Sequence, residues 1–140
     1  MKSSQTGLTL NNKPHRVRQG IALLWASAAI VGVLTLATGV GLLPNVGPTA
    51  ETTITNLITI AMLAVVALKL AKRRNWARWF FVVVYGLGSG LFLLSLLVAP
   101  EVWLSFPLWT RFSAPLQFVL QTLALIFMFS SSANQWFRSR

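Results

Sequence analysis

The chain has 140 residues, of which 55% are hydrophobic and only 10% are charged. Soluble domains of this size carry about 25% charged residues, so these few charges cannot cover a water-facing surface, and the composition favours an integral membrane protein. The net charge of +10 would suggest a nucleic-acid partner in a soluble protein. Here the cations lie beside apolar runs, so we expect them to orient the chain in a membrane, and we expect no nucleic-acid partner.

Residues 1–19 are polar and basic and show no apolar period, which predicts a flexible cytoplasmic tail. An uncharged run follows at 21–43. As a helix rising about 1.5 Å per residue it spans roughly 35 Å, enough to cross the hydrocarbon core. The run exceeds the roughly 7–15 apolar residues of a signal-peptide core, so we expect a retained first transmembrane helix.

Three further apolar runs predict transmembrane helices at 52–71, 76–98 and 112–129. Ser113 as a possible cap and Pro115 in the first turn place the start of the last helix. The expected fold is therefore an all-α integral membrane protein. Residues 20–140 would form one transmembrane domain, a four-helix antiparallel bundle.

The sequence KRRNWARWF, from Lys72 to Phe80, forms the short turn between the second and third helices. Lys and Arg concentrate in short cytoplasmic segments of membrane proteins. With four spans, the tail, this turn and the C-terminus lie on one side, which then holds all the cations except Arg111, while both acids, Glu51 and Glu101, lie on the other. We therefore expect both termini in the cytoplasm.

The same basic turn predicts contacts with the lipid bilayer beyond orientation. A dense group of cations beside a membrane attracts anionic headgroups. We expect Arg73, Arg74 and Arg78 to make these contacts.

Side chains that could carry chemistry are missing from the predicted spans. No Asp, Glu, His or Arg lies deep within them, and the single histidine, His15, is in the tail. Proton-coupled pumps use embedded carboxylates, haem sites use imidazole, and hydrolysis needs a base beside its nucleophile. We therefore expect neither an enzyme nor a cofactor or metal site.

Uncharged polar side chains do occur within the spans. On the second helix they form one stripe at i, i+3, i+4 and i+7, made of Thr52, Thr55, Asn56 and Thr59. Gln117 and Gln121 share one face of the fourth helix. We expect Asn56 to hydrogen-bond with Gln117 or Gln121 across a helix contact, which contributes about 0.6 kcal/mol. The alternative is that these residues line a path for a solute or ligand.

Small and aromatic residues mark two further surfaces. Gly86 and Gly90 form a GxxxG pattern that lets another helix approach closely, and we favour packing within the bundle over docking of a partner. In the outer segment 99–111 and just after it, aromatic rings recur every three residues, at Trp103, Phe106, Trp109 and Phe112. Pro107 predicts two short helical pieces there. The rings would anchor the segment in lipid or form a docking surface for a partner subunit.

The segments KRRNWARWF and FSSSANQWFR resemble those of a loose group of small four-span inner-membrane proteins of Gram-negative bacteria. Chains of that group carry an NWAR-type basic turn after the second span and close on an ANxWF-type end. The resemblance implies the four-span arrangement and the bacterial inner membrane. The group has no established activity, so the resemblance implies none here.

Together these features predict a non-catalytic accessory subunit that binds and stabilises a larger membrane protein complex. The alternative is a small oligomeric transporter or channel lined by Asn56, Gln117 and Gln121. Copurification separates the two, because the first predicts foreign subunits in fixed ratio and the second only copies of the chain itself.

Overall fold

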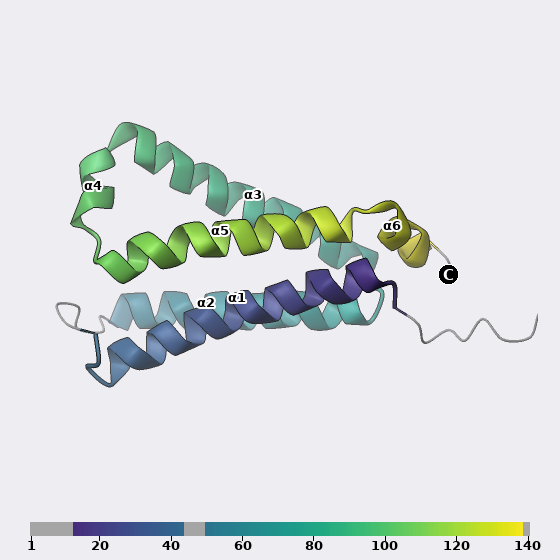
Figure 1. The fold of residues 1–140 in the computed structure, drawn as a ribbon, viewed down its shortest axis with the longest axis horizontal. Coiled ribbons are helices and arrows are strands. Elements are labelled where there is room, and N and C mark those ends of the chain that lie inside the picture. Colours follow the sequence, from purple (N-terminus) through teal and green to yellow (C-terminus); the bar gives the residue numbers. More distant parts are fainter. Residues whose placement is uncertain (1–12, 44–49, 139–140) are drawn as a thin grey trace, which may run out of the picture.

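The computed structural model describes residues 13–43 and 50–138, and every regular element in these two ranges is a helix (Figure 1). The helices are α1 (His15–Gly39), α2 (Ala50–Ala71), α3 (Asn75–Val98), α4 (Pro100–Ser105), α5 (Leu108–Met128) and α6 (Ser131–Arg138). Four of them, α1, α2, α3 and α5, are long and apolar enough to cross a membrane. The all-helical class is therefore confirmed, and the four long helices correspond to the four predicted spans, which is compatible with a multi-pass membrane protein.

The first helix begins and ends earlier than predicted. It starts at His15, so the last part of the expected tail is helical, because Val17 and Gly20 are buried and give these polar turns an apolar contact. It ends where Gly41 adopts a positive φ of 71°. The backbone N–H of Gly41 and of Leu42 then bond back into the last turn, as at many helix ends that close on glycine.

The fourth membrane-spanning helix, α5, also starts earlier, at Leu108. Pro107 precedes it, and the N–H groups of Thr110 and Arg111 bond to the Pro107 carbonyl. The predictions of Ser113 as a cap and Pro115 in the first turn were wrong, since both lie inside the helix. The predicted break at Pro107 is confirmed, but the second helical piece is the beginning of α5 itself.

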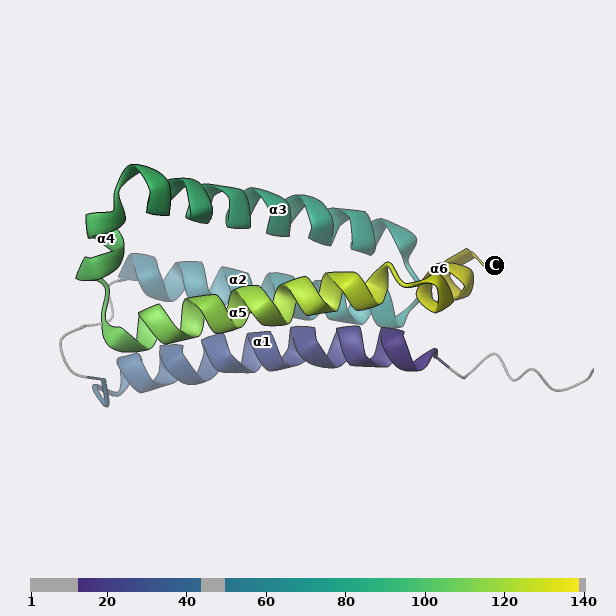
Figure 2. The ribbon, with the colours of Figure 1, turned by 45° about the horizontal axis from the view of Figure 1, so that its top comes forward.

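Figures 1 and 2 show α1, α2 and α5 running side by side, with α1 in contact with both of its neighbours. α3 meets this group in its first half, where Ala77, Arg78 and Phe81 are buried and Tyr85 bonds to α5, and it then diverges towards α4. We call the end that contains α6 the closed half and the end that contains α4 the open half.

The packed core lies in the closed half. Its buried apolar side chains come from α1, α2, α3, α5 and α6 and include Leu24, Leu63, Val66, Leu70, Phe81, Met128 and Phe137. Small residues allow the helices to approach closely there. A Cβ added to Gly20 would lie 3.2 Å from Met128 Cγ and 3.3 Å from the Ala124 carbonyl oxygen.

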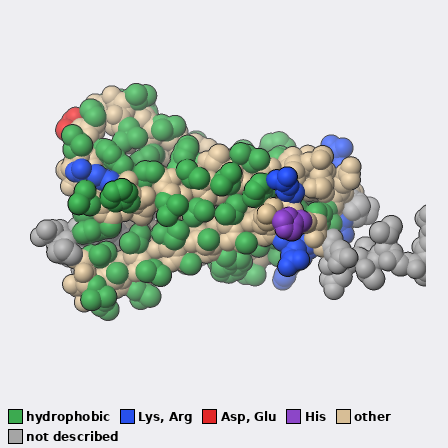
Figure 3. Space-filling view, in the orientation of Figure 1, with side chains coloured by type: hydrophobic (Ala, Val, Ile, Leu, Met, Phe, Trp, Pro, Cys, Tyr) green, Lys and Arg blue, Asp and Glu red, His purple; other side chains and the backbone are tan. Residues whose placement is uncertain are grey.

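Charge is distributed along the long axis of the molecule. Figure 3 shows apolar side chains covering the face between the two ends, with most visible cations near α6 and an acidic side chain near α4. An apolar band between polar ends suits a chain that crosses a bilayer lengthwise.

Candidate functional site

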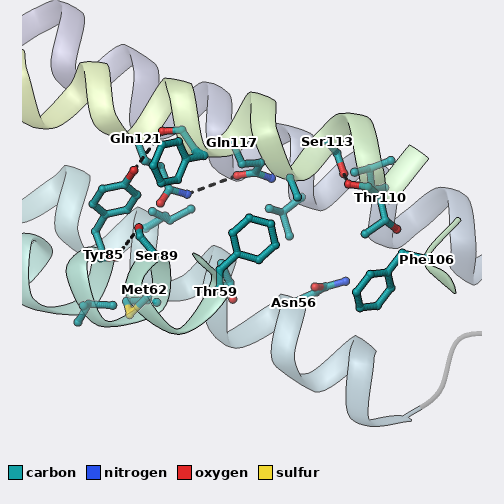
Figure 4. A pocket seen from close by; sticks show the side chains of 18 of the residues that line it. Asn56, Thr59, Met62, Tyr85, Ser89, Phe106, Thr110, Ser113, Gln117 and Gln121 are labelled. Carbon is teal, nitrogen blue, oxygen red and sulfur yellow. Dashed lines mark hydrogen bonds between the residues drawn. The ribbon is translucent and has the colours of Figure 1, made fainter. Parts of the chain in front are cut away.

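A cavity of about 810 Å³ separates the diverging part of α3 from the other three long helices (Figure 4). Its walls come from α1, α2, α3 and α5, and Phe106 and Pro107 border it between α4 and α5. Leu63 and Phe81, which also belong to the core, border it towards the closed half. No charged side chain is among the described residues that line it.

A hydrogen-bonded group lies on the α5 side of this cavity and reaches α1. Ser27 is fully buried and donates its hydroxyl hydrogen to Gln117 Oε1. Gln121 Nε2 lies 3.0 Å from Ser27 Oγ and 3.4 Å from Gln117 Oε1. An interhelical polar contact therefore exists, but it joins α5 to α1 rather than to α2.

The predicted bond from Asn56 to Gln117 or Gln121 was wrong. Asn56 lies on the α2 wall of the cavity, and its amide hydrogen-bonds to none of the residues that the structure describes. α2 packs against α1 and α3, so Asn56 and Thr59 of its polar stripe line the cavity instead of contacting α5, and Thr55 is exposed. Thr59 of the same stripe bonds its own helix, at the Thr55 carbonyl, and the side chain of Thr52 lies outside the described residues.

The hydroxyls on the α3 wall are already satisfied. Tyr85 shares a hydrogen bond of 2.6 Å with Thr122 Oγ1 and donates at 3.2 Å to the Phe118 carbonyl. Ser89 donates to the Tyr85 carbonyl. The Tyr85 side chain thus links α3 to α5 at the deep part of the cavity.

The glycines of α3 do not pack within the chain. A Cβ added at Gly86, Gly88 or Gly90 would meet nothing within 4 Å. The favoured use of the GxxxG pattern, packing inside the bundle, was therefore wrong. Only Gly88 of the three lines the cavity.

The four aromatic residues of the outer segment have different surroundings. Trp103 packs edge-on against Phe92 of α3, with ring centroids 5.5 Å apart. Phe106 and Trp109 line the mouth of the cavity, whereas Phe112 is 76% exposed. Arg111 donates from Nε to the Phe106 carbonyl at 2.9 Å and so ties the end of α4 to α5.

The basic turn KRRNWARWF and the segment FSSSANQWFR touch each other in the closed half. Arg73, in the left-handed conformation with φ 58°, donates from Nε to the Trp136 carbonyl at 3.1 Å, and its guanidinium lies 4.8 Å from the Trp136 ring centroid. Arg78 Nη2 donates to Asn134 Oδ1, and its guanidinium stacks 4.4 Å from the ring of Phe129 and 4.7 Å from that of Phe137.

This arginine clamp, made of Arg73 and Arg78, holds the short helix α6 against the start of α3. Arg78 is only 5% exposed, which leaves little of it for a lipid headgroup. Arg74 is exposed and remains the better placed of the three predicted lipid contacts. Neither α6 nor the partner role of Ser27 was predicted from the sequence. For α6, the available signal was the presence of two segments that each combine basic and aromatic residues, since these segments pack together.

Comparison of the chain with family models, curated proteins and solved structures found no match.

Proposed function

We propose that the chain is a non-catalytic accessory subunit that binds a larger membrane protein complex through α3. The observation that carries this proposal is that most of the α3 surface is not covered by the rest of the chain. Only 6% of its most apolar 18-residue stretch is buried within the chain, against 22% for α1 and for α2. A membrane helix left this free contacts either lipid or another protein.

The glycines favour a protein over lipid. Glycine inside a helix costs about 0.5–1 kcal/mol relative to alanine, and here no close approach within the chain compensates for it. A helix from a second protein would gain that contact, because small residues let two backbones approach within a membrane. Gly86 and Gly90, four residues apart, lie on one face of α3, on the side away from the cavity.

The proposal includes a topology and a location. The four long helices alternate in direction as an antiparallel bundle, and the closed half, with its cations, faces the cytoplasm under the positive-inside rule. Both termini then lie in the cytoplasm. The bacterial inner membrane follows from the resemblance of the basic turn and the ANQWF end, whose mutual contact supports treating them as one feature. Arg74 would contact anionic lipid at this face.

The test is copurification from the native membrane in a mild detergent, followed by mass spectrometry. The wild-type chain is expected to retain a foreign membrane protein in fixed ratio. Gly86→Leu with Gly90→Leu should release it. The matched control, Ala22→Leu with Ala26→Leu, places the same bulk at the same spacing on exposed positions of α1 and should retain the partner. Equal retention by both double variants would refute the proposal.

One observation favours the alternative, a small oligomeric transporter or channel. Asn56, Gln117 and Gln121 do line a single cavity. However, packed residues such as Leu63 and Phe81 border its inner end, so a transport cycle would have to open the closed half. Two results together would establish this alternative. The chain would copurify only with copies of itself, and it would support a solute flux that the Asn56→Leu variant lacks.

A further inference from the structure

The cavity contains hydrogen-bond donors that the chain does not use. Gln117 Oε1 accepts from Ser27 and from Gln121, but the Gln117 Nε2 group donates to none of the described residues. The amide of Asn56 is also unused within the described residues, and Figure 4 shows it on the wall opposite Gln117. Both amides are half-buried, and in the apolar surroundings of a membrane an amide hydrogen without an acceptor is costly.

The other polar side chains of the cavity form hydrogen bonds among themselves or with their own helices. Thr59, Ser89 and Ser113 donate to carbonyls of their own helices, so their hydroxyl hydrogens are not available to a ligand. Gln121 and Tyr85, which lie deeper, are paired with neighbouring side chains. The unused donors thus gather in the outer part of the cavity, and the inner part is bounded by paired polar groups and by apolar side chains.

Charge and size define what fits. With no charged side chain in the described lining, an ionised group would lie in a low-dielectric site without a counter-ion, which costs several kcal/mol. The volume of about 810 Å³ falls in the range of pockets that hold small organic ligands. The cavity lies between membrane-spanning helices, so the ligand reaches it from the bilayer.

We propose that the cavity binds one uncharged lipid whose head carries carbonyl oxygens, with the head between Asn56 and Gln117 and the apolar chain against the deep wall near Val84 and Phe81. The order of polarity along the cavity matches a lipid that enters from the open half with its head outward. Two sources share this chemistry, an acylglycerol with ester carbonyls and a prenyl quinone with ring carbonyls. The site is separate from the Gly86 and Gly90 face, so it does not depend on the proposed partner.

The test uses the purified full-length chain in nanodiscs and native mass spectrometry, with dioleoylglycerol and a prenylated benzoquinone as the two probes. At least one is expected to bind at one molecule per chain, and the one that binds identifies the source. Dioleoylphosphatidylglycerol, which has the same acyl chains and an anionic head, should bind at least tenfold more weakly. The diether analogue of dioleoylglycerol, which lacks the carbonyls, should also bind more weakly.

Variants separate this cavity from the rest of the surface. Gly88→Phe fills the cavity from α3 and should abolish binding, and Ser113→Phe fills it from α5 and should do the same. The matched control Gly86→Phe adds the same ring two residues away, outside the lining, and should bind like wild type. Asn56→Leu should weaken binding about three- to twentyfold, the loss of one hydrogen bond in a membrane site.

The proposal is overturned if neither carbonyl probe binds, if the anionic lipid binds as tightly as the neutral one, or if both cavity-filling variants bind like wild type. The copurification experiment tests the Gly86 and Gly90 face, and the lipid-binding experiment tests the cavity. Failure of either experiment therefore leaves the other proposal unaffected.

Discussion

The arginine clamp allows a quantitative prediction about how α6 is held. Asn134 accepts a hydrogen bond from Arg78 Nη2, and its own Nδ2 donates to the Phe129 carbonyl at 3.1 Å. Replacing Asn134 by Ala removes both bonds and leaves a buried guanidinium whose Nε already has no partner among the described residues. A hydrogen bond to a charged group contributes about 1.5–3 kcal/mol. We expect Asn134→Ala to destabilise the docking of α6 by about 2–3 kcal/mol.

Thiol reactivity measures this docking directly, because the chain has no cysteine of its own. Ala133→Cys places a thiol at a position with no exposed surface, so a water-soluble maleimide reacts only when α6 undocks. Adding Asn134→Ala should speed its labelling about 30- to 140-fold, at 1.4 kcal/mol for each tenfold change. Ser131→Cys, at an exposed position of α6, should label at the same rate in both backgrounds.

Two further variants test whether Asn134 holds α6 through Arg78. Gln135→Ala, an exposed neighbour on α6, should leave the labelling of Ala133→Cys unchanged. Arg78→Met combined with Asn134→Leu should restore much of the protection, because replacing both partners leaves no buried polar group unpaired. If Asn134→Ala changes the labelling rate less than threefold, the arginine clamp does not hold α6 in place.

The remaining predictions concern helix packing and are measured as unfolding free energies in detergent. Ser27→Ala should cost about 1–2 kcal/mol, because it removes the α1–α5 hydrogen bonds, while Ser95→Ala, whose hydroxyl bonds only its own helix, should cost less than 0.5 kcal/mol; equal losses would contradict the assignment. Gly20→Leu should destabilise by about 1–3 kcal/mol through overpacking against Met128, unlike Gly39→Leu, whose Cβ meets nothing. Asn56→Leu should leave stability unchanged within about 0.5 kcal/mol, and a loss above 1 kcal/mol would mean that its amide has a partner in the chain.

The apolar runs predicted the four long helices because length and lack of charge are what a bilayer selects. They could not predict which helix stays bare. α3 is as apolar as α1 and α2. In a membrane, the surfaces that face lipid and those that face protein are both apolar, so the apolar pattern does not show which face of a helix packs against the rest of the chain. The amino-acid composition of α3 therefore could not predict that it diverges from the other helices, nor that a cavity forms there.

The polar contacts show the same limit at the level of single residues. The spacing of Gln117 and Gln121 placed both correctly on one face of α5, but the spacing does not say which helix lies opposite. Because α5 packs on α1, a lone serine, Ser27, became the partner in place of the more conspicuous Asn56. Helix α6 was missed because eight amphipathic residues are too short for an apolar run, and their docking depends on Arg73 and Arg78 from a distant segment.

Site-specific photocrosslinking in intact cells tests most directly whether α3 binds a partner. A photoreactive amino acid at Leu94, which continues the Gly86 and Gly90 face of α3, is compared with the same residue at Leu36 of α1 and Ile58 of α2, all of them exposed apolar positions. The account predicts a discrete adduct with a foreign membrane protein at Leu94 and none at the other two. Adducts confined to lipid, or equal at all three positions, would contradict it.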